Sequence, residues 1–339
     1  MVMMAVFLVL AFLASLILTG WFRHYAIATR LLDIPNARSS HHQPTPRGGG
    51  LAVVCVFLFS VPVFFLMGLM TSGELCAFLG SGALVAVVGF MDDRRHIPAH
   101  LRLAAHFLAA AWGLFWLGGM PGLPMINLVQ VSGMGSVLGL FYLVWLLNLY
   151  NFMDGIDGLA AIEAISVCAG GGLLYWLAGN NAHYWPLAIL AMAVAGFLCW
   201  NFPPAKIFMG DAGSGFLGLV LGLFSIQAAW SAPQFFWSWL ILLGVFIVDA
   251  TWTLLHRLLG GEKFYEAHRS HAYQRAARRF GAHKPVSLAV VMINLFWLLP
   301  VALWVGKGGL NGLLGLLLAY CPLFILALIF KAGSKEVSE

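Results

Sequence analysis

Charged side chains are scarce in this sequence, at 9% of 339 residues against 61% hydrophobic ones. Soluble domains carry about 25% charged residues, so the composition excludes an ordinary soluble domain and indicates an integral membrane protein. The sequence also lacks CxxC spacing, because its five cysteines fall singly in apolar runs, at positions 55, 76, 168, 199 and 321. A disulfide framework or zinc site is therefore not expected, and we interpret the cysteines as packing residues.

Internal repeats, low-complexity linkers and a soluble domain are also missing from the sequence. What remains is a series of apolar runs, and a membrane-spanning helix needs about 20 such residues. Eleven runs qualify, at about 1–20, 51–71, 75–91, 102–119, 135–152, 159–178, 183–201, 214–230, 234–256, 286–305 and 309–331. The first has no basic residue before it and no small-residue cleavage site, so we expect a retained span and not a signal peptide. The prediction is an all-α integral membrane protein with about eleven transmembrane helices, in which residues 1–339 form a single domain.

The basic residues predict the orientation of the chain, because lysine and arginine concentrate in cytoplasmic loops. If the loops after the odd-numbered runs are cytoplasmic, every lysine and arginine except Lys307 lies on that side. The N-terminus is then outside and the C-terminus is cytoplasmic. The cytoplasmic loops at 21–50, 92–101, 202–213 and 257–285 also hold most of the acids and histidines, so we expect them to form the active face.

The first polar cluster is RSSHHQPTPRGGG, residues 38–50. Its prolines favour an extended chain, and its three glycines allow a close backbone approach. Arg38 and Arg47 have two interpretations. They enforce topology, which we favour for this segment taken alone, or their planar guanidinium groups bind phosphate.

The second cluster is GFMDDRRHIPAH, in which Asp92 and Asp93 adjoin the end of the third apolar run. As solvated loop charges, they would be balanced by Arg94 and Arg95. However, two adjacent carboxylates beside an apolar helix repel each other and lose hydration unless a cation joins them. A magnesium–phosphate site would supply that cation.

The third cluster is NLYNFMDGIDGLAA, residues 148–161. An asparagine or aspartate recurs at every third position, namely Asn148, Asn151, Asp154 and Asp157. On a helix these side chains would form a polar stripe facing one cleft, and Gly155 would let a flat or phosphorylated ligand approach the backbone. Capping of the next helix explains only one or two of these polar groups. We therefore interpret the stretch as a ligand site.

The fourth cluster is NFPPAKIFMGDAGSGFLG, residues 201–218, where a Pro-Pro break precedes a glycine-rich turn at the start of the next apolar run. Backbone amides at a helix N-terminus attract anions, and glycines let a phosphate come close. Alternatively, Asp211 or Ser214 is an ordinary N-cap.

Together, NxxNxxDGxDG, FMGDAGS, the Asp92–Asp93 pair and PTPRGGG resemble the polyprenyl-phosphate N-acetylhexosamine-1-phosphate transferases, over roughly residues 33–285. Within that family the chain is most similar to the branch that starts O-antigen synthesis. The resemblance implies transfer of N-acetylhexosamine-1-phosphate from a UDP-sugar to undecaprenyl phosphate, with release of UMP, at the cytoplasmic face of the bacterial inner membrane. It implies Mg²⁺, or alternatively Mn²⁺, as cofactor. Membrane lipids are expected partners, nucleic acid is not, and a homodimer is left open.

The resemblance also assigns roles by motif. Asp211 and Asp92 are the implied metal ligands, and Asp92 with Asp93 is the implied catalytic pair. The implied substrate-binding residues are Asn148, Asn151, Asp154, Gly155, Asp157, Phe208, His268, Arg269, His271, Arg38 and Arg47. Phe208 would stack on uracil, and the HRSH segment would contact the donor's diphosphate or sugar. An aspartyl-phosphate intermediate stays open, but direct attack is favoured because it needs only alignment.

Two other classes of protein fit parts of the pattern. A secondary transporter also uses intramembrane acids, but it predicts polar groups near the midplane in both halves of a repeat. A CDP-alcohol phosphotransferase shares a motif like DGIDG, but no arginine follows Asp157 at the spacing it needs. Glu163 and Asp249 lie inside apolar runs, where acids are functional suspects. We expect Glu163 to support the site and Asp249 to pair with a polar group on a neighbouring helix.

Overall fold

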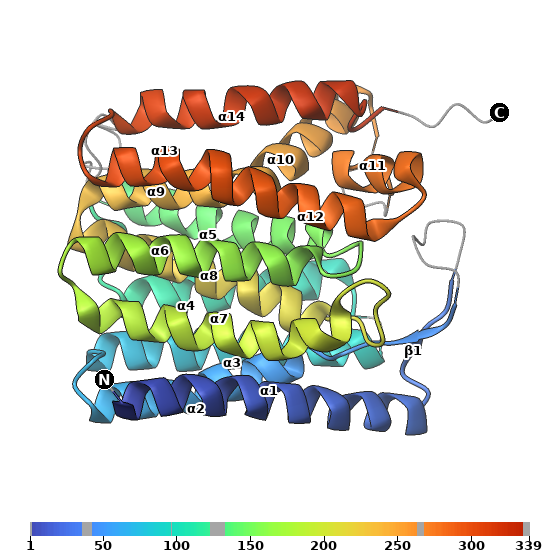
Figure 1. Ribbon diagram of the computed structural model, residues 1–339, viewed down its shortest axis with the longest axis horizontal. Helices are drawn as coiled ribbons and strands as arrows, with labels where there is room; N and C mark the ends of the chain where they lie inside the picture. The colour runs from blue at the N-terminus through green and yellow to red at the C-terminus, as the bar shows by residue number, and fades with distance from the viewer. Residues whose placement is uncertain (1, 36–42, 96, 123–132, 263–267, 335–339) are drawn as a thin grey trace.

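The computed structural model describes residues 2–35, 43–95, 97–122, 133–262 and 268–334. Within these ranges the chain is a bundle of helices that run side by side along one direction (Figure 1). The helices are α1 (Val2–Ala28), α2 (Leu51–Leu66), α3 (Ser72–Arg94), α4 (Ala99–Trp116), α5 (Met134–Met153), α6 (Leu159–Leu177), α7 (Asn181–Asn201), α8 (Asp211–Ser231), α9 (Pro233–Leu242), α10 (Gly244–Leu259), α11 (Ala272–Phe280), α12 (His283–Ile293), the π-helix η2 (Asn294–Leu298), α13 (Leu299–Gly306) and α14 (Gly312–Ile329).

One short antiparallel pair of strands lies in the described part of the chain. β1 (Leu32–Asp33) pairs with β2 (Thr45–Pro46), with Leu32 opposite Pro46 and Asp33 opposite Thr45. The pair lies at the same end of the bundle as α11 (Figure 1). It carries the chain from α1 to the glycine segment that precedes α2, as the extended preference of the prolines predicts.

All eleven apolar runs contain helix in the described residues. In the part of the chain that the structure describes, eight helices are long and apolar enough to cross a membrane, and α9 with α10 would make a ninth span if the bent pair counts as one. The other two runs correspond to α4 and to the 16-residue α2. The protein is therefore all-α with multiple candidate spans, while the expected number of eleven exceeds the nine that meet this test of length and composition.

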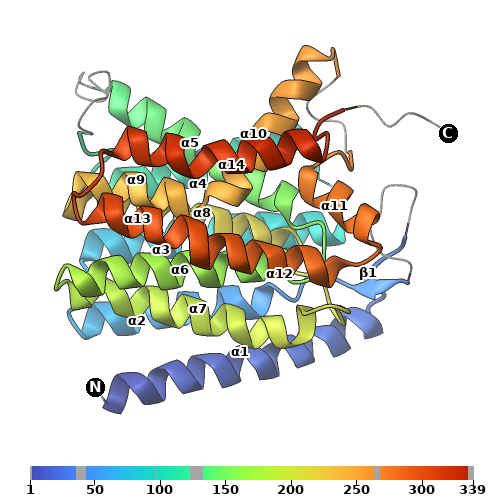
Figure 2. The ribbon, with the colours of Figure 1, turned by 45° about the horizontal axis from the view of Figure 1, so that its top comes forward.

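The sequence predicts one span over the apolar run at 234–256, and the structure adds a bend within that run. The run is divided into α9 and α10, which are bent by 70°. The break falls immediately before Gly244, a residue type that weakens a helix by about 1 kcal/mol relative to alanine. As a result, α10 projects from the bundle at the end that carries α11 (Figure 2).

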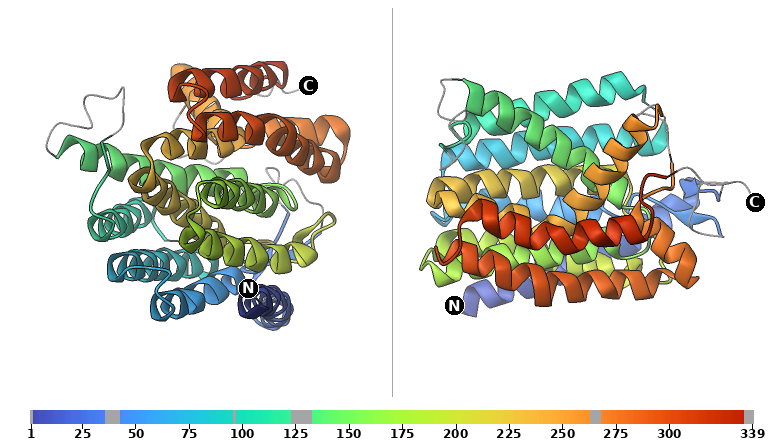
Figure 3. Two further views of the ribbon diagram at one scale, coloured as in Figure 1. Left: turned by 60° about the vertical axis from the view of Figure 1, so that its left-hand side comes forward. Right: turned by 90° about the horizontal axis from the view of Figure 1, so that it is seen from above.

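The centre of the bundle is α8, whose 18-residue apolar window is entirely buried. The view in Figure 3 shows other helices around it. Small residues let its neighbours come close, as is usual between membrane helices: a Cβ on Gly218 would lie 2.8 Å from the carbonyl oxygen of Leu146 on α5, and one on Gly89 of α3 would lie 2.5 Å from the Ala212 nitrogen. The start of α8 is thereby held between α3 and α5.

Candidate active site

The start of α8 carries a charge cluster that joins α3 to α4. Arg102, in the first turn of α4, donates from Nη1 to the Oδ2 atom of Asp92, and the same Nη1 lies 3.4 Å from the Oδ2 atom of Asp211. The backbone nitrogen of Ile97 donates to the Oδ1 atom of Asp92 at 2.7 Å. The Asp92 side chain is 4% exposed and that of Asp211 is 32% exposed. Asp211 is therefore open to a ligand, and Asp92 balances the charge of Arg102 behind it.

Asp93 points at the N-terminus of α8. Its carboxylate accepts hydrogen bonds from the backbone nitrogens of Asp211 at 3.1 Å and Ala212 at 3.3 Å. Arg47 lies beside it, with Nε 3.9 Å from the Oδ1 atom of Asp93 and Nη2 donating to the Asp93 carbonyl. A carboxylate at this position satisfies free amides and offsets the positive end of the helix dipole. Asp93 therefore fixes α8 against α3.

The glycine segment that precedes α2 packs against the residues that precede α8. The backbone nitrogens of Gly49 and Gly50 donate to the carbonyls of Phe208 and Met209, each at 2.9 Å. A Cβ on Gly50 would lie 2.5 Å from the Cα atom of Gly213. The close approach that the sequence predicts for these glycines is therefore an approach to the backbone of α8, and this pairing also holds the main chain of Phe208 in place.

The polar stripe is only partly helical. Asn148 donates from Nδ2 to the carbonyl of Val144 in its own helix at 2.7 Å, and Ser214 of α8 donates from Oγ to the Oδ1 atom of Asn151 at 3.2 Å. Because α5 ends at Met153, the expectation of one helical stripe through all four polar residues is wrong.

Asp157 lies beyond the end of α5 and ties the α5–α6 turn to two distant segments. Its Oδ2 atom accepts from the backbone nitrogen of Ala205 at 2.9 Å, and its Oδ1 atom lies 3.1 Å from the Nδ1 atom of His283. Its carbonyl accepts from the hydroxyl of Ser287 at 2.8 Å. The next residue, Gly158, donates its N–H to the Oδ1 atom of Asn201 at 2.9 Å. These bonds give Asp157 a clear role in positioning the turn.

In the α5–α6 turn, the side-chain oxygens of Asp154 are open to a ligand. Asp154 is partly buried, and no hydrogen bond or ion pair from the described residues reaches its side chain. Burial, followed by the charges of Asp211, Asp93 and Asp157, raises the pKa of Asp154 well above its ordinary value. A carboxylate pushed toward its neutral form by nearby carboxylates gains most from an added cation. Asp154 and Asp211 are therefore the side chains best placed to meet one.

Gly155 packs against α11, which leaves no room for a side chain at this position. A Cβ at this position would collide with the hydroxyl of Tyr273, which donates to the carbonyl of Phe152 at 2.9 Å. The structure thus gives this glycine a packing reason where we expected a ligand to approach the backbone.

Asp249 holds the N-terminus of α11. It accepts from the backbone nitrogens of Ala272 at 2.9 Å and Tyr273 at 3.0 Å, and its Oδ1 atom lies 3.2 Å from the Nδ1 atom of His271. This is the structural pairing with a neighbouring helix that the sequence predicts for Asp249. The His271 side chain is only 4% exposed, so within the HRSH segment it is used mainly to anchor α11.

The other two predicted residues of the HRSH segment lie next to this anchor. The rings of His268 and His271 have centroids 4.8 Å apart. Burial, together with the charges of His271 and Arg257, lowers the pKa of His268 to about 3, so His268 is neutral at pH 7. Arg269 accepts at its carbonyl from the Nη2 atom of Arg278 at 2.9 Å.

Glu163 does not contact the charge cluster through any hydrogen bond in the described residues. Its Oε2 atom accepts from the Nδ2 atom of Asn294 at 2.6 Å, which joins α6 to the π-helix η2. The expected support of the site by Glu163 is therefore replaced by a bond between two helices. Arg38 lies outside the described residues, and the side chain of Arg47 is about one-third exposed, at 36%.

Three residues of this region hold the site together although the sequence does not identify them as site residues. The basic-residue pattern indicates only a cytoplasmic position for Arg102, although an arginine at the start of the apolar run that follows two aspartates is also a signal for an ion pair. For Asn201 and His283 the sequence gives no sign of their partners, because those partners in the α5–α6 turn lie 43 and 126 residues away along the chain.

The donor set can be tested for its fit to Mg²⁺. The described residues contain no group of three or more His, Cys, Asp or Glu side chains arranged to hold a metal. Mg²⁺ usually takes one or two carboxylates and completes its shell with water and substrate phosphates. Asp211 and Asp154, with Asp92 behind Arg102, meet that requirement because they offer oxygen ligands and an uncompensated negative charge.

An all-α membrane bundle that gathers carboxylates and glycine-flanked backbone at a helix N-terminus defines a site suited to phosphorylated ligands. The chain belongs to glycosyl transferase family 4, whose family model matches residues 75–229. That stretch contains all the carboxylates of the charge cluster and the α5–α6 turn.

Relatives extend this similarity over most of the chain. A decaprenyl-phosphate N-acetylglucosaminephosphotransferase of Mycolicibacterium smegmatis is 31% identical over 306 residues, covering 81% of this chain and 75% of the relative. A probable undecaprenyl-phosphate N-acetylglucosaminyl 1-phosphate transferase of Bacillus subtilis is 28% identical over 318 residues, covering 88% and 84%. An undecaprenyl-phosphate alpha-N-acetylglucosaminyl 1-phosphate transferase of Thermotoga maritima is 25% identical over 303 residues, covering 85% and 87%.

Proposed function

We propose that this protein transfers N-acetylhexosamine-1-phosphate from a UDP-sugar to undecaprenyl phosphate and releases UMP. The proposal rests on the family and on one structural observation, the convergence of Asp154, Asp211 and the N-terminus of α8 at one end of the bundle. The product would start a cell-surface polysaccharide such as O-antigen. The relatives named above carry N-acetylglucosamine in their names, which supports a donor of the N-acetylhexosamine class.

The proposed reaction is a direct in-line displacement. An oxygen of the lipid phosphate attacks the sugar-linked phosphorus of the donor, a new P–O bond forms, and the bond from that phosphorus to the bridging oxygen breaks so that UMP leaves with the electron pair. A phosphate monoester is largely dianionic at pH 7, because its second pKa is near 6. The attacking group therefore needs no general base, and a covalent aspartyl intermediate is not required.

The residues divide the work between binding and positioning. Asp211 and Asp154 would hold Mg²⁺, or Mn²⁺ in its place, which would neutralise the diphosphate charge when bound. Asp154 takes the place of Asp92, the ligand implied by the motif, because Asp92 is only 4% exposed and is bonded to Arg102. Arg102 stays between Asp92 and Asp211, where it limits the repulsion between them. Asp93 positions α8 and Asp157 positions the α5–α6 turn.

The donor would occupy the open side of this end of the bundle. Asn148 and Asn151 lie on the adjoining part of α5, and Gly155 follows Asp154. Phe208 remains the proposed stacking partner of uracil. The HRSH segment, through His268 and Arg269, and the arginines Arg38 and Arg47 remain the proposed contacts to the phosphates and sugar.

The same proposal includes the membrane topology. We propose eleven spans with the N-terminus outside, the C-terminus and the site on the cytoplasmic face, and residence in the bacterial inner membrane. The described ends of the chain support an odd number of passes, because α1 starts at one end of the bundle and α14 finishes at the other (Figure 1). Membrane lipids would surround the exposed apolar faces, and assembly as a homodimer is part of the proposal.

The test is UMP release by the purified protein in detergent. We expect release that requires both undecaprenyl phosphate and Mg²⁺, with the preferred sugar found from a panel of UDP-N-acetylhexosamines. Folded protein that releases no UMP from any donor would contradict the proposal. Release of CMP from a CDP-alcohol, or lipid-independent transport of the donor into vesicles, would favour one of the two rival classes instead.

A further inference from the structure

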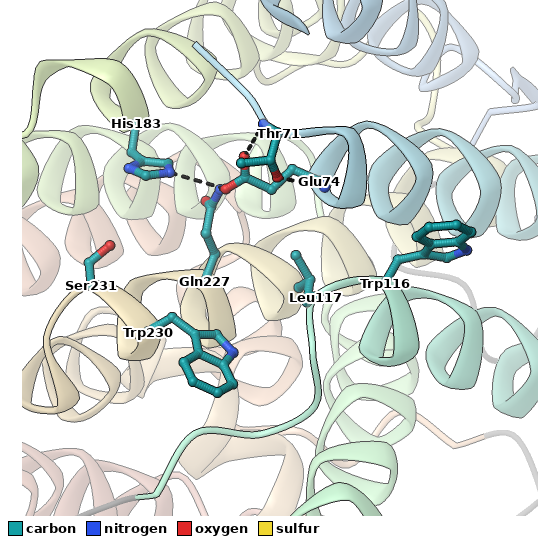
Figure 4. A pocket seen from close by; sticks show the side chains of 8 residues that line it. All are labelled: Thr71, Glu74, Trp116, Leu117, His183, Gln227, Trp230 and Ser231. Carbon is teal, nitrogen blue, oxygen red and sulfur yellow. Dashed lines mark hydrogen bonds and ion pairs between the residues drawn. The ribbon is translucent and has the colours of Figure 1, made fainter. Parts of the chain in front are cut away.

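A polar cavity lies at the other end of the bundle from the charge cluster. It has a volume of about 210 Å³ and is lined by Thr71, Glu74, Trp116, Leu117, His183, Gln227, Trp230 and Ser231 (Figure 4). One water molecule needs only about 10–15 Å³ of such space, so the cavity has room for a small organic group. Glu74 and Asp92 lie 18 residues apart on α3, which places them about 27 Å apart along the helix at 1.5 Å per residue.

The polar atoms of the cavity offer acceptors. The Oε2 atom of Glu74 accepts from the backbone nitrogen of Thr71 at 2.6 Å, and its Oε1 atom accepts from the Nε2 atoms of His183, at 3.1 Å, and Gln227. A carboxylate offers about four acceptor positions, so these three bonds leave one on Oε2. Gln227 is 4% exposed and its Oε1 atom is buried without a partner. A ligand with hydrogen-bond donors would therefore satisfy these acceptors.

The free acceptors and the aromatic lining favour a donor of the ammonium type. None of the eight lining residues is a lysine or arginine, and the basic side chain among them, His183, meets the Oε1 atom of Glu74 and leaves Oε2 to a ligand. Trp116 and Trp230 line the same cavity as the Glu74–Gln227 pair (Figure 4), and an indole face attracts an ammonium group within about 6 Å. A primary ammonium carries three N–H groups for the free acceptors, whereas a quaternary ammonium carries none.

The position of the cavity favours a lipid as the source of this group. A separation of about 27 Å from the charge cluster is close to the roughly 30 Å thickness of a bilayer core. Trp116 and Trp230 are 38% and 53% exposed, and exposed tryptophans mark the head-group level of a membrane. We propose that this cavity binds the primary ammonium of a phospholipid head group of the ethanolamine type, in the leaflet opposite to the charge cluster.

The test compares head groups on the full-length protein in detergent. Native mass spectrometry would count bound lipid as phosphatidylethanolamine or phosphatidylcholine with identical acyl chains is titrated. We expect at least tenfold tighter binding of phosphatidylethanolamine, because methylation removes every N–H donor. Equal binding of the two lipids would overturn the proposal, and this comparison needs no variant.

Two variants locate the bound lipid. Glu74→Gln keeps a side chain that can complete the capping box of α3 but removes the charge, and Gln227→Met removes the free amide oxygen. We expect both to abolish the preference for phosphatidylethanolamine, while the matched change Gln234→Met, at an exposed position in the first turn of α9, leaves it intact. A preference that survives both cavity variants would overturn the assignment. Competition by free ethanolamine at equal concentration would keep the ammonium site but assign it to a soluble amine.

Discussion

Asp93 and Asp211 lie at the same helix N-terminus, and the structure predicts that mutation of Asp93 lowers stability whereas mutation of Asp211 lowers turnover. Asp93→Asn leaves one amide oxygen for two backbone N–H groups of α8, and its NH₂ group faces the second donor. Loss of a charge-assisted bond costs about 1.5–3 kcal/mol, and a buried amide without a partner costs about 1–3 kcal/mol. Because the Asp93 side chain is 1% exposed, water cannot replace the lost acceptor. We expect Asp93→Asn to destabilise the protein by about 2–3 kcal/mol.

Asp211→Asn serves as the matched contrast. Its carboxylate lies 3.4 Å from Arg102, and both side chains are about one-third exposed, at 32% and 31%. Such partly exposed pairs contribute about 0–1 kcal/mol, so the fold should lose little. The proposed metal-ligand role predicts instead that turnover falls by about 100-fold or more.

The assay is thermal unfolding in detergent, followed by size-exclusion chromatography, beside UMP release at saturating substrates. If each kcal/mol shifts Tm by about 2 °C, Asp93→Asn should lower Tm by about 4–6 °C and Asp211→Asn by no more than about 2 °C. An equal loss of Tm in the two variants would show that Asp93 does not position α8 as described. If Asp93→Asn keeps Tm but loses all turnover, Asp93 acts in catalysis, as its motif implies, and not in positioning.

Gly155→Ala should destabilise the protein, because the added Cβ would collide with the Tyr273 hydroxyl. The double variant that also carries Tyr273→Phe should regain part of the lost Tm. No gain in Tm in the double variant would contradict this contact. Because the fold raises the pKa of Asp154, metal-free protein should lose stability as the pH rises from near 4 toward that raised pKa. Asp154→Asn should flatten the resulting decline in Tm between pH 5 and 8. Parallel Tm curves for the wild type and the variant would contradict the charge repulsion at Asp154. Chelation by EDTA should abolish turnover without lowering Tm at pH 5, and added Mg²⁺ should restore turnover. Full turnover in EDTA would remove the metal from the proposal.

Hydropathy predicted most of the helices well. The runs at 135–152 and 159–178 correspond closely to Met134–Met153 and Leu159–Leu177, because a spanning helix must be apolar along its whole length. Hydropathy could not predict the 70° bend between α9 and α10. A hydropathy value averages the composition of a segment and carries no information about the direction of the chain, so a bent apolar run and a straight one give the same value.

The sequence located the polar clusters but could not assign partners within them. Asp92 and Asp93 look equivalent as letters, yet successive residues on a helix point about 100° apart, so one meets Arg102 and the other meets the α8 backbone. Gly155 likewise gives no sign of its neighbour, since Tyr273 lies 118 residues further along the chain. Partner choice depends on tertiary packing, which motif spacing does not encode.

A phosphorus label distinguishes transfer of the sugar-1-phosphate from transfer of the sugar alone. Donor labelled with ³²P in the sugar-linked phosphate of the UDP-sugar would be incubated with the purified protein, undecaprenyl phosphate and Mg²⁺, and the organic and aqueous products would be separated. We expect the label to move into the lipid and UMP to leave unlabelled, with Asp211→Asn as the inactive control. Label that stays in the aqueous phase as UDP, while the sugar alone reaches the lipid, would rule out the proposed reaction.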